Sequence, residues 1–501
     1  MTASSASSAP EPRTYRVGGP ARTGLWRGMR TAERRALLIG ALPALLLAMV
    51  GGTAGLLAGG GLFLAVAGFT YLPNRRLGGV TTLRWSIDEA RFRQLARHPL
   101  GTRAWEAGIG GDGPVPVEPP PTVGPVAWFR GAVRGEELGV LYSGGAYLML
   151  LEVTSDGGDP DPAERDAQAA SWSAFLDRLS VETSLVSLVG QVERQTAAAP
   201  DAHLRWLDTR ADPSCPPQLM ASYREIVAQV AVQSEDHRNW LLLGVPDGEP
   251  LARALVRATP SGQPPGVGAL LSVLQREAAA VIGQLRSAGL SLVRVVGEAG
   301  YAGLVRHLHE PDRPLDDPRV RTGRDAWPRH LASHRRALLV GGTPEHPEPS
   351  WAHATAAVGF TGDEELSTFL DAALITAPGI TRTFTVISRL SPWRAAYAQS
   401  RTMAVDDRAE VRKRTAEGIG HDLADVRQLT HSEQVMADTH SRACGVTSTA
   451  WLTVSAPDLA ALEEAQRAAL AAAGGLTVEW CDKEHATAFV NTLPLARGIR
   501  R

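Results

Sequence analysis

A run of 37 residues near the N-terminus, from Ala36 to Leu72, contains no charged side chain. As a single helix it would be about 55 Å long, whereas the hydrocarbon core of a bilayer is about 30 Å thick. Two shorter spans fit better: Ala36–Val50 would cross the bilayer, Gly51-Gly52 would form a turn, and Thr53–Leu72 would cross back. Because a soluble helix is rarely apolar on every face, the run predicts a transmembrane hairpin.

Arginine clusters flank this run on both sides. Residues 1–35 carry seven arginines and two acids, and residues 73–106 carry seven arginines and three acids. The first 106 residues therefore hold a charge of +9, and the rest of the chain holds -11 of the total of -2. Since basic flanks stay on the cytoplasmic side, both termini are predicted to be cytoplasmic, with the hairpin in the plasma (inner) membrane.

Length and composition predict several folded units after the hairpin. The chain has 501 residues, of which 44% are hydrophobic and 21% are charged, so it can build a sizeable core. Three cysteines fit a reducing compartment, and the near-neutral total argues against direct nucleic-acid binding. The predicted divisions are a basic N-terminus 1–35, the hairpin 36–72, a juxtamembrane basic helix and linker 73–122, α+β modules 123–210 and 211–390, and a closing unit 391–501.

Hydrophobic periodicity predicts an α+β cytoplasmic region. Gly144-Gly145 is a hairpin signal, and Gly289 is a predicted helix C-cap. The repeated β-α-β pieces predict ferredoxin-like modules, although no repeat of fixed period is visible. Strands are expected at 126–130, 138–142, 146–153, 184–192, 239–245, 290–296, 336–340, 352–360, 381–390, 447–455 and 476–481. Helices are expected at 163–179, 219–236, 267–288, 299–309, 364–375, 392–442, 458–473 and 484–491, with a Pro/Gly loop at 246–266.

The sequence carries no nucleotide-binding or hydrolase motif. A P-loop requires a lysine after a glycine-rich loop, and the chain has only Lys413 and Lys483, neither of which follows one. There is also no G-x-S-x-G elbow and no H-E-x-x-H pair. We therefore expect no catalytic residues, no bound cofactor and no enzymatic activity.

Metal binding is a weaker alternative. His440 and Cys444 are four residues apart, as are Cys481 and His485, so these four could form a Cys2His2 zinc site. Buried cysteines and surface histidines would explain the same residues without a metal. His330 and His334 have helical metal spacing, which leaves open a membrane-bound enzyme that uses the histidines of 307–353.

A resemblance to a known family covers almost the whole chain. It rests on the order and spacing of many short segments, the clearest being Ala488-Phe489 followed by Leu493 to Ile499. The other segments are Thr14-Tyr15, Gly24-Leu25-Trp26, Leu83-Arg84-Trp85, Arg91 to Arg97, Ala170 to Leu179, Val192-Glu193-Arg194, Ser222-Tyr223-Arg224, His237 to Val245 and Arg382 to Thr385. Together they resemble conjugation-cluster membrane proteins of high-GC Gram-positive bacteria, in which the small inner-membrane subunit of type IV secretion is fused to the N-terminal, non-motor region of the VirB-type transfer ATPase. The stretch Ala352 to Thr355 departs from that pattern.

This resemblance implies a scaffold that works with a motor on another chain. The chain stops three residues after Gly498, at what resembles the junction before the motor domain. The implied partners are a separately encoded P-loop ATPase, other channel subunits, the lipid bilayer and further copies of the chain. The candidate ATPase-docking or junction residues are Leu493, Pro494, Leu495, Arg497 and Gly498. A membrane component of a type VII (ESX-like) secretion core is the alternative function.

Overall fold

The structure, a computed structural model, describes most of the chain after the basic N-terminus. Two compact units are formed, one within Gly19–Ala104 and one from Trp105 onwards. The first contains helices α1 and α2, and the second contains an antiparallel sheet with its covering helices. Apart from a few single positions, the described residues are 31–71, 105–106, 119–155, 162–181, 184–197, 214–231, 235–261, 263–328, 330–341, 350–360, 377–416, 444–474 and 476–498.

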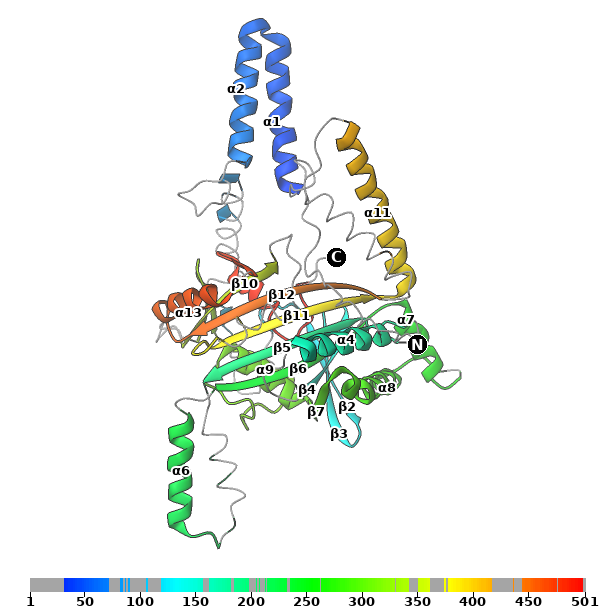
Figure 1. Ribbon diagram of the computed structural model, residues 1–501, viewed down its shortest axis with the longest axis vertical. Helices are drawn as coiled ribbons and strands as arrows, with labels where there is room; N and C mark the ends of the chain where they lie inside the picture. Colours follow the sequence, from blue (N-terminus) through cyan, green and yellow to red (C-terminus); the bar gives the residue numbers. More distant parts are fainter. Residues whose placement is uncertain are drawn as a thin grey trace, which may run out of the picture. The chain divides into compact units, whose positions relative to one another are not determined.

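The first unit contains two helices joined at Gly51, α1 (Thr31–Val50) and α2 (Gly52–Tyr71) (Figure 1). Small residues bring them together. A Cβ added at Gly40 would lie only 2.6 Å from a methyl group of Val66, so the backbone of α1 lies directly against α2 there. Ala44 is 4% exposed within the same pair.

The outward faces of both helices are apolar. Met49 is 76% exposed and Leu57 is 77% exposed. Among the described residues, the stretch Gly52–Thr70 is long and apolar enough to cross a membrane, and 11% of it is buried. The uncharged part of α1, Ala36–Val50, spans only about 22 Å at 1.5 Å per residue, because Glu33, Arg34 and Arg35 occupy its first turn.

The second unit is built on one sheet in which every described strand pair is antiparallel (Figure 1). Its strands follow the order β1-β8-β9-β10-β12-β11-β5-β6-β4-β3-β2, with β13 beside β10 and β7 beside β4. Helices and strands therefore mix as the α+β class requires. The predicted module boundary at 210 falls between two neighbouring strands of this sheet, β5 and β6, and the boundary at 390 falls within β11.

The sheet contains the same arrangement twice. Each half begins with a hairpin, which is followed by a long strand, β4 in one half and β10 in the other. One edge of this long strand pairs with the hairpin along part of its length and with the last strand of the half along the rest. The strand order is β7-β4-β6-β5 in one half and β13-β10-β12-β11 in the other. A helix follows the last strand of each half. We call these halves repeat 1 (126–309) and repeat 2 (330–489).

Repeat 1 comprises β2 (Val126–Val133), β3 (Glu136–Ser143), β4 (Ala146–Ser155), α4 (Pro162–Leu179), β5 (Leu188–Ala197), α6 (Pro217–Ala231), β6 (Glu235–Pro246), α7 (Glu249–Ala258), α8 (Val267–Gln284), β7 (Leu290–Val295) and α9 (Glu298–His309). Repeat 2 comprises β8 (His330–Ser333), β9 (Leu338–Val340), β10 (Trp351–Phe360), β11 (Arg382–Ser391), α11 (Trp393–Ala416), β12 (Gly445–Ala456), α13 (Leu459–Ala472), β13 (Leu476–Trp480) and α14 (His485–Phe489). Strand β1 (Trp105–Glu106) pairs with β8.

The likeness of the two halves has a short counterpart in the sequence. Residues 240–247 read WLLLGVPD and residues 451–458 read WLTVSAPD, with tryptophan, leucine, proline and aspartate at the same four places. The two segments end β6 and β12, which are equivalent strands. In the sheet, Trp240 lies opposite Glu152 of β4, and Trp451 lies opposite Ala357 at the matching position of β10.

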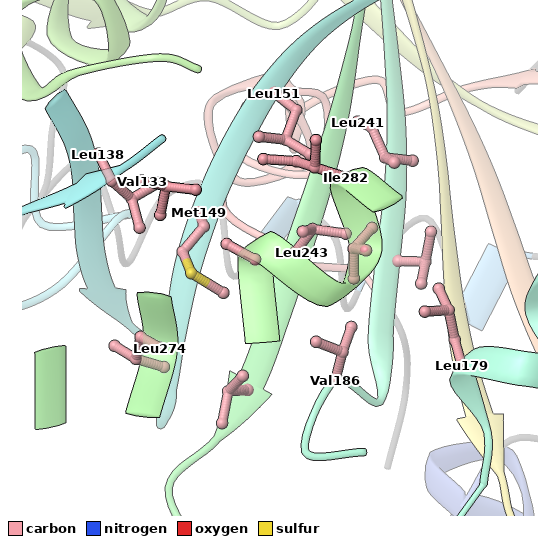
Figure 2. Close-up of a cluster of buried hydrophobic side chains, with 14 of the residues drawn as sticks. Val133, Leu138, Met149, Leu151, Leu179, Val186, Leu241, Leu243, Leu274 and Ile282 are labelled. Carbon is pink, nitrogen blue, oxygen red and sulfur yellow. The ribbon is translucent and has the colours of Figure 1, made fainter. Parts of the chain in front are cut away.

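The repeats join through β5 and β11, which pair antiparallel from Leu188–Arg389 to Gln195–Arg382. Helices cover both faces of this continuous sheet, with α4, α7, α8 and α13 on the first face. Over repeat 1, Figure 2 shows Leu274 and Ile282 of α8 beside Met149 of β4 and Leu243 of β6. Over repeat 2, α13 packs on the same face. The opposite face lies under α9, α14 and the residues that follow α14.

Most of the predicted elements are present, and three places differ from the prediction. The Pro/Gly loop expected at 246–266 contains helix α7, because Pro250 is suited to a helix start and Leu251 is buried. His330 begins strand β8, so the helical spacing assumed for His330 and His334 is wrong. The strand expected at 184–192 begins later and runs to Ala197. The predicted helix 364–375, the end of the helix 392–442 and the basic segments around the hairpin lie largely outside the described residues.

Candidate functional site: a buried polar layer

The most unusual part of the sheet is a row of polar side chains in its interior. Thr355 of β10, Thr453 of β12, Thr383 of β11 and Arg194 of β5 lie side by side across four neighbouring strands. Each is at most 2% exposed. His353 and Ser455 extend the row on the same face; we call these residues, with Thr385, the polar layer.

Hydroxyl groups satisfy one another within this layer. The Thr453 hydroxyl lies 2.8 Å from that of Thr355 and 2.9 Å from that of Thr492. The Thr385 hydroxyl donates to the Thr492 carbonyl oxygen at 3.0 Å. Buried polar groups are stable only when they are hydrogen-bonded, so this chain of hydroxyls fixes the positions of three strands and of the residues after α14.

Imidazoles enclose one side of the layer. His353 Nε2 donates to the His309 carbonyl oxygen at 2.9 Å, so its Nδ1 accepts from the Ser455 hydroxyl, also at 2.9 Å. Burial lowers the pKa of His353 to about 3, and the pKa of His309 to about 4. Phe489 closes the cluster, with its ring centroid 4.9 Å from that of each imidazole.

Arg194 is the cation of the layer. Its Nη1 donates to the Thr383 hydroxyl at 2.9 Å, and its Nε lies 3.5 Å from His307 Nε2. Burial lowers the pKa of Arg194 to about 9, which still leaves it charged at neutral pH. Burial also lowers the pKa of His307 to about 3, helped by the nearby charges of Arg194 and Arg238.

The predicted junction residues lie above this layer. Leu493 is 0% exposed and Leu495 is 1% exposed, so their side chains belong to the core. The Tyr301 hydroxyl of α9 donates to the Pro494 carbonyl oxygen. Arg497 Nη2 donates at 3.0 Å to the Val123 carbonyl oxygen and to the Ser143 hydroxyl.

Residues 491–498 therefore form a strap across the face of the sheet. At one end Thr492 bonds to repeat 2, and at the other end Arg497 bonds to repeat 1. The last described residue, Gly498, has φ of 91°, and a Cβ there would lie 2.5 Å from the indole nitrogen of Trp451. Glycine is thus required where the strap passes Trp451.

The suggested zinc site is not assembled. Cys444 lies beside α4, where its backbone N–H donates to Asp177, whereas the Cys481 N–H donates to the Thr355 carbonyl oxygen. Thr355 lies opposite Thr453 of β12, nine residues along the chain from Cys444, so about 31 Å of extended chain separate these places. His485 bonds the Thr355 N–H, and His440 lies outside the described residues. Within the part of the chain that the structure describes, no three potential ligands come together.

Sequence reasoning did not identify the polar layer. Its signal was present in strand 352–360, where His353 and Thr355 occupy alternate positions, and in Thr453 and Ser455 of a later strand. Alternating polar residues normally indicate a solvent-facing side of a strand. Here that side is covered by α9, α14 and the strap, and only the tertiary structure reveals the cover.

Comparison with known proteins identifies no relative: no family model matches the chain, and no curated protein matches its sequence significantly.

Proposed function

We propose that this chain is a non-enzymatic membrane scaffold of a type IV secretion or conjugation apparatus, which docks a separately encoded P-loop ATPase at the channel. The observation that carries the proposal is the apolar exterior of the α1–α2 pair. The core helix of a soluble protein is mostly buried, whereas 11% of Gly52–Thr70 is buried. Lipid is the solvent in which such a surface is stable.

The proposed membrane insertion includes both helices. Gly52–Thr70 has 19 residues, or about 28 Å, which matches the hydrocarbon thickness. The shorter apolar part of α1 can cross if the bilayer thins locally. Both ends of the hairpin would then lie in the cytoplasm.

The proposed platform consists of two ferredoxin-like modules. The β-α-β-β-α-β order of repeat 1 and the strand order 4-1-3-2 in both repeats support this assignment. Each repeat inserts a helix between its second and third strands, α6 in repeat 1 and α11 in repeat 2. Each insertion follows the C-terminal end of its strand, β5 or β11, and these two strands are antiparallel, so the insertions begin at opposite ends of the strand pair. They would therefore offer two separate places for partners.

A scaffold role agrees with the chemistry of the polar layer. His309 is 1% exposed and His353 is 0% exposed, and each donates a hydrogen bond to a backbone carbonyl. General acid–base catalysis needs a group within hydrogen-bond reach of a substrate. The junction residues 493–495 would act by holding the strap in place, and the partly exposed Arg497 and Gly498 would mark where contact with the motor begins.

Co-purification with the motor tests this function. The full chain, extracted from native membranes in mild detergent, should retain a P-loop ATPase that mass spectrometry identifies, and the chain expressed alone should not hydrolyse ATP. A variant with Gly40→Ile, which forces α1 away from Val66, provides a matched control for the membrane unit. Hydrolysis by the isolated chain, or recovery without any ATPase, would refute the proposal.

A further inference from the structure

Arg194 carries a buried positive charge for which the described residues supply no acid. It lies on β5 at the join between the repeats and is 2% exposed. Its Nη1 and Nε have the two contacts given above, to Thr383 and His307. Among the described residues, Nη2 has no hydrogen-bond partner although it is fully enclosed.

Both contacts of Arg194 are electrically neutral. His307 Nδ1 lies 2.6 Å from the Arg313 carbonyl oxygen, which can only accept, so Nδ1 carries the proton and Nε2 is an acceptor. A threonine hydroxyl is neutral as well. Neither group offsets the large cost of removing an unpaired guanidinium from water.

Neighbouring arginines show how the chain normally compensates such charges. Arg238, beside Arg194 on β6, lies 3.0 Å from Asp236 and 3.5 Å from Glu152. Arg382 is also 2% exposed, and its Nη2 likewise has no hydrogen-bond partner among the described residues, but Glu193 and Glu235 lie close enough to raise its pKa against the effect of burial. For Arg194 burial is the single cause of the shift in pKa, and no carboxylate of the described residues opposes it.

We propose that Arg194 binds a small inorganic anion of the size of chloride within the polar layer. Nη2 donates to the anion, and Thr383, whose hydroxyl oxygen accepts from Nη1, donates its own proton to it. The three residues are closed to solvent, with Arg194 and Thr383 2% exposed and His307 6% exposed, and for this reason the anion that we propose is a small one. This anion would neutralise the charge of Arg194 where the two repeats meet. The inference does not depend on the proposed role in secretion.

Thermal unfolding of the full chain in detergent tests this site. At constant ionic strength, replacing sodium gluconate by sodium chloride should raise the Tm of the wild type by about 3 °C, because a ligand that binds only the folded state stabilises it. Arg194→Met should remove this difference. In gluconate the variant should be at least as stable as the wild type, because an unpaired buried charge has been replaced by an apolar side chain.

Arg382→Met is the matched control, and it should keep the chloride dependence. Bromide provides a test that needs no variant: crystals of the wild type grown in bromide should show an anomalous peak within hydrogen-bond distance of Arg194 Nη2. Equal Tm values for the wild type in both salts, or a water molecule without anomalous signal at Nη2, would overturn the proposal.

Discussion

Repeat 1 and repeat 2 share a strand order but fill the same layer with opposite chemistry. In repeat 1, the positions under α9 hold Leu148, Leu150 and Leu242, and the neighbouring position of β5 is Gly190. In repeat 2, the equivalent positions hold His353, Thr355, Thr453 and Thr383. All of the leucines are at most 1% exposed, and the polar residues at most 2%.

This difference shows that the same strand order can be stabilised by two different kinds of side chain. The strand order is set by the backbone pairing and by the face under α8 and α13, which is apolar in both repeats. The opposite face can then be closed by leucines, through the hydrophobic effect, or by hydroxyls and imidazoles that bond in a fixed geometry. The second solution specifies position more strictly, and it is found where the strap crosses the sheet.

Acid should produce the largest difference between the repeats. The folded pKa values of His307, His309 and His353 are about 3, 4 and 3, below the ordinary value of 6.5. Between pH 6.5 and about 4, the unfolded chain therefore binds protons that the folded chain does not. Stability is complete above pH 6.5 and falls with acid, with a slope approaching three protons, or about 4 kcal/mol per pH unit.

Hydrogen exchange measured against pH checks this expectation. Strand β10, whose His353 is bonded to the His309 carbonyl oxygen of α9, should lose protection before β4 and β6, whose positions under α9 are leucines. The replacement His353→Leu, which introduces the leucine found at the equivalent position 148, should reduce the slope by about one proton. A slope unchanged by that replacement would show that the layer does not control acid unfolding.

Placing a hydroxyl among the leucines of repeat 1 should have the next largest effect on stability. Leu242→Thr removes buried methyl groups and leaves a hydroxyl among leucines, so we expect a loss of about 3 kcal/mol in urea denaturation. Leu242→Val is the matched control, because it has nearly the shape of threonine without the hydroxyl, and it should cost about 1 kcal/mol. Equal losses for the two variants would mean that polarity is not what distinguishes the layers.

Removing one hydroxyl from repeat 2 tests the opposite exchange. Thr453→Val keeps the shape but deprives Thr355 and Thr492 of a partner, so we expect a loss of about 1–2 kcal/mol by the same measurement. Thr453→Ser, which retains the oxygen, should lose less. A valine variant more stable than the wild type would indicate that the polar layer contributes no net stability.

The smallest expected effect concerns the attachment of the strap to repeat 1. Arg497→Ala removes the bonds to Val123 and Ser143 and should cost about 1 kcal/mol, since the side chain is partly exposed. Hydrogen exchange should increase in residues 496–498, while the bonds from Thr385 to Thr492 and from Tyr301 to Pro494 keep the rest of the strap attached. Faster exchange throughout repeat 2 would contradict the division of the strap into two attachments.

Local structure was largely predictable from the sequence because its signals are local. The Gly144-Gly145 hairpin is confirmed, with φ of 61° and 80° at its two residues. Gly289 ends its helix in the left-handed conformation, with φ of 74°. The helix predicted from Asp458 begins one residue later, at Leu459, because the Asp458 side chain caps it by accepting from the Ala461 N–H at 2.8 Å. Each of these depends on neighbours within a few residues.

The duplication and the polar layer could not be read in the same way. The pairing of β5 with β11 joins residues that are nearly 200 positions apart, and no periodicity encodes which strands meet. Insertions of different length, 198–234 and 392–444, separate the equivalent strands and remove any fixed period. Equivalent positions that hold leucine in one repeat and threonine in the other make the similarity between the two sequences hard to recognise.

The membrane hairpin is the part of the account on which the proposed function depends most. Its most direct test is labelling with a membrane-impermeant thiol reagent in right-side-out membrane vesicles. Thr53→Cys places a thiol at the turn between α1 and α2, and the native Cys215, which is partly exposed, reports on the unit from Trp105 onwards. We predict that the introduced thiol is labelled in intact vesicles and that Cys215 is labelled only after permeabilisation; labelling of Cys215 in intact vesicles, or protection of both thiols there, would contradict a cytoplasmic platform on a two-span anchor.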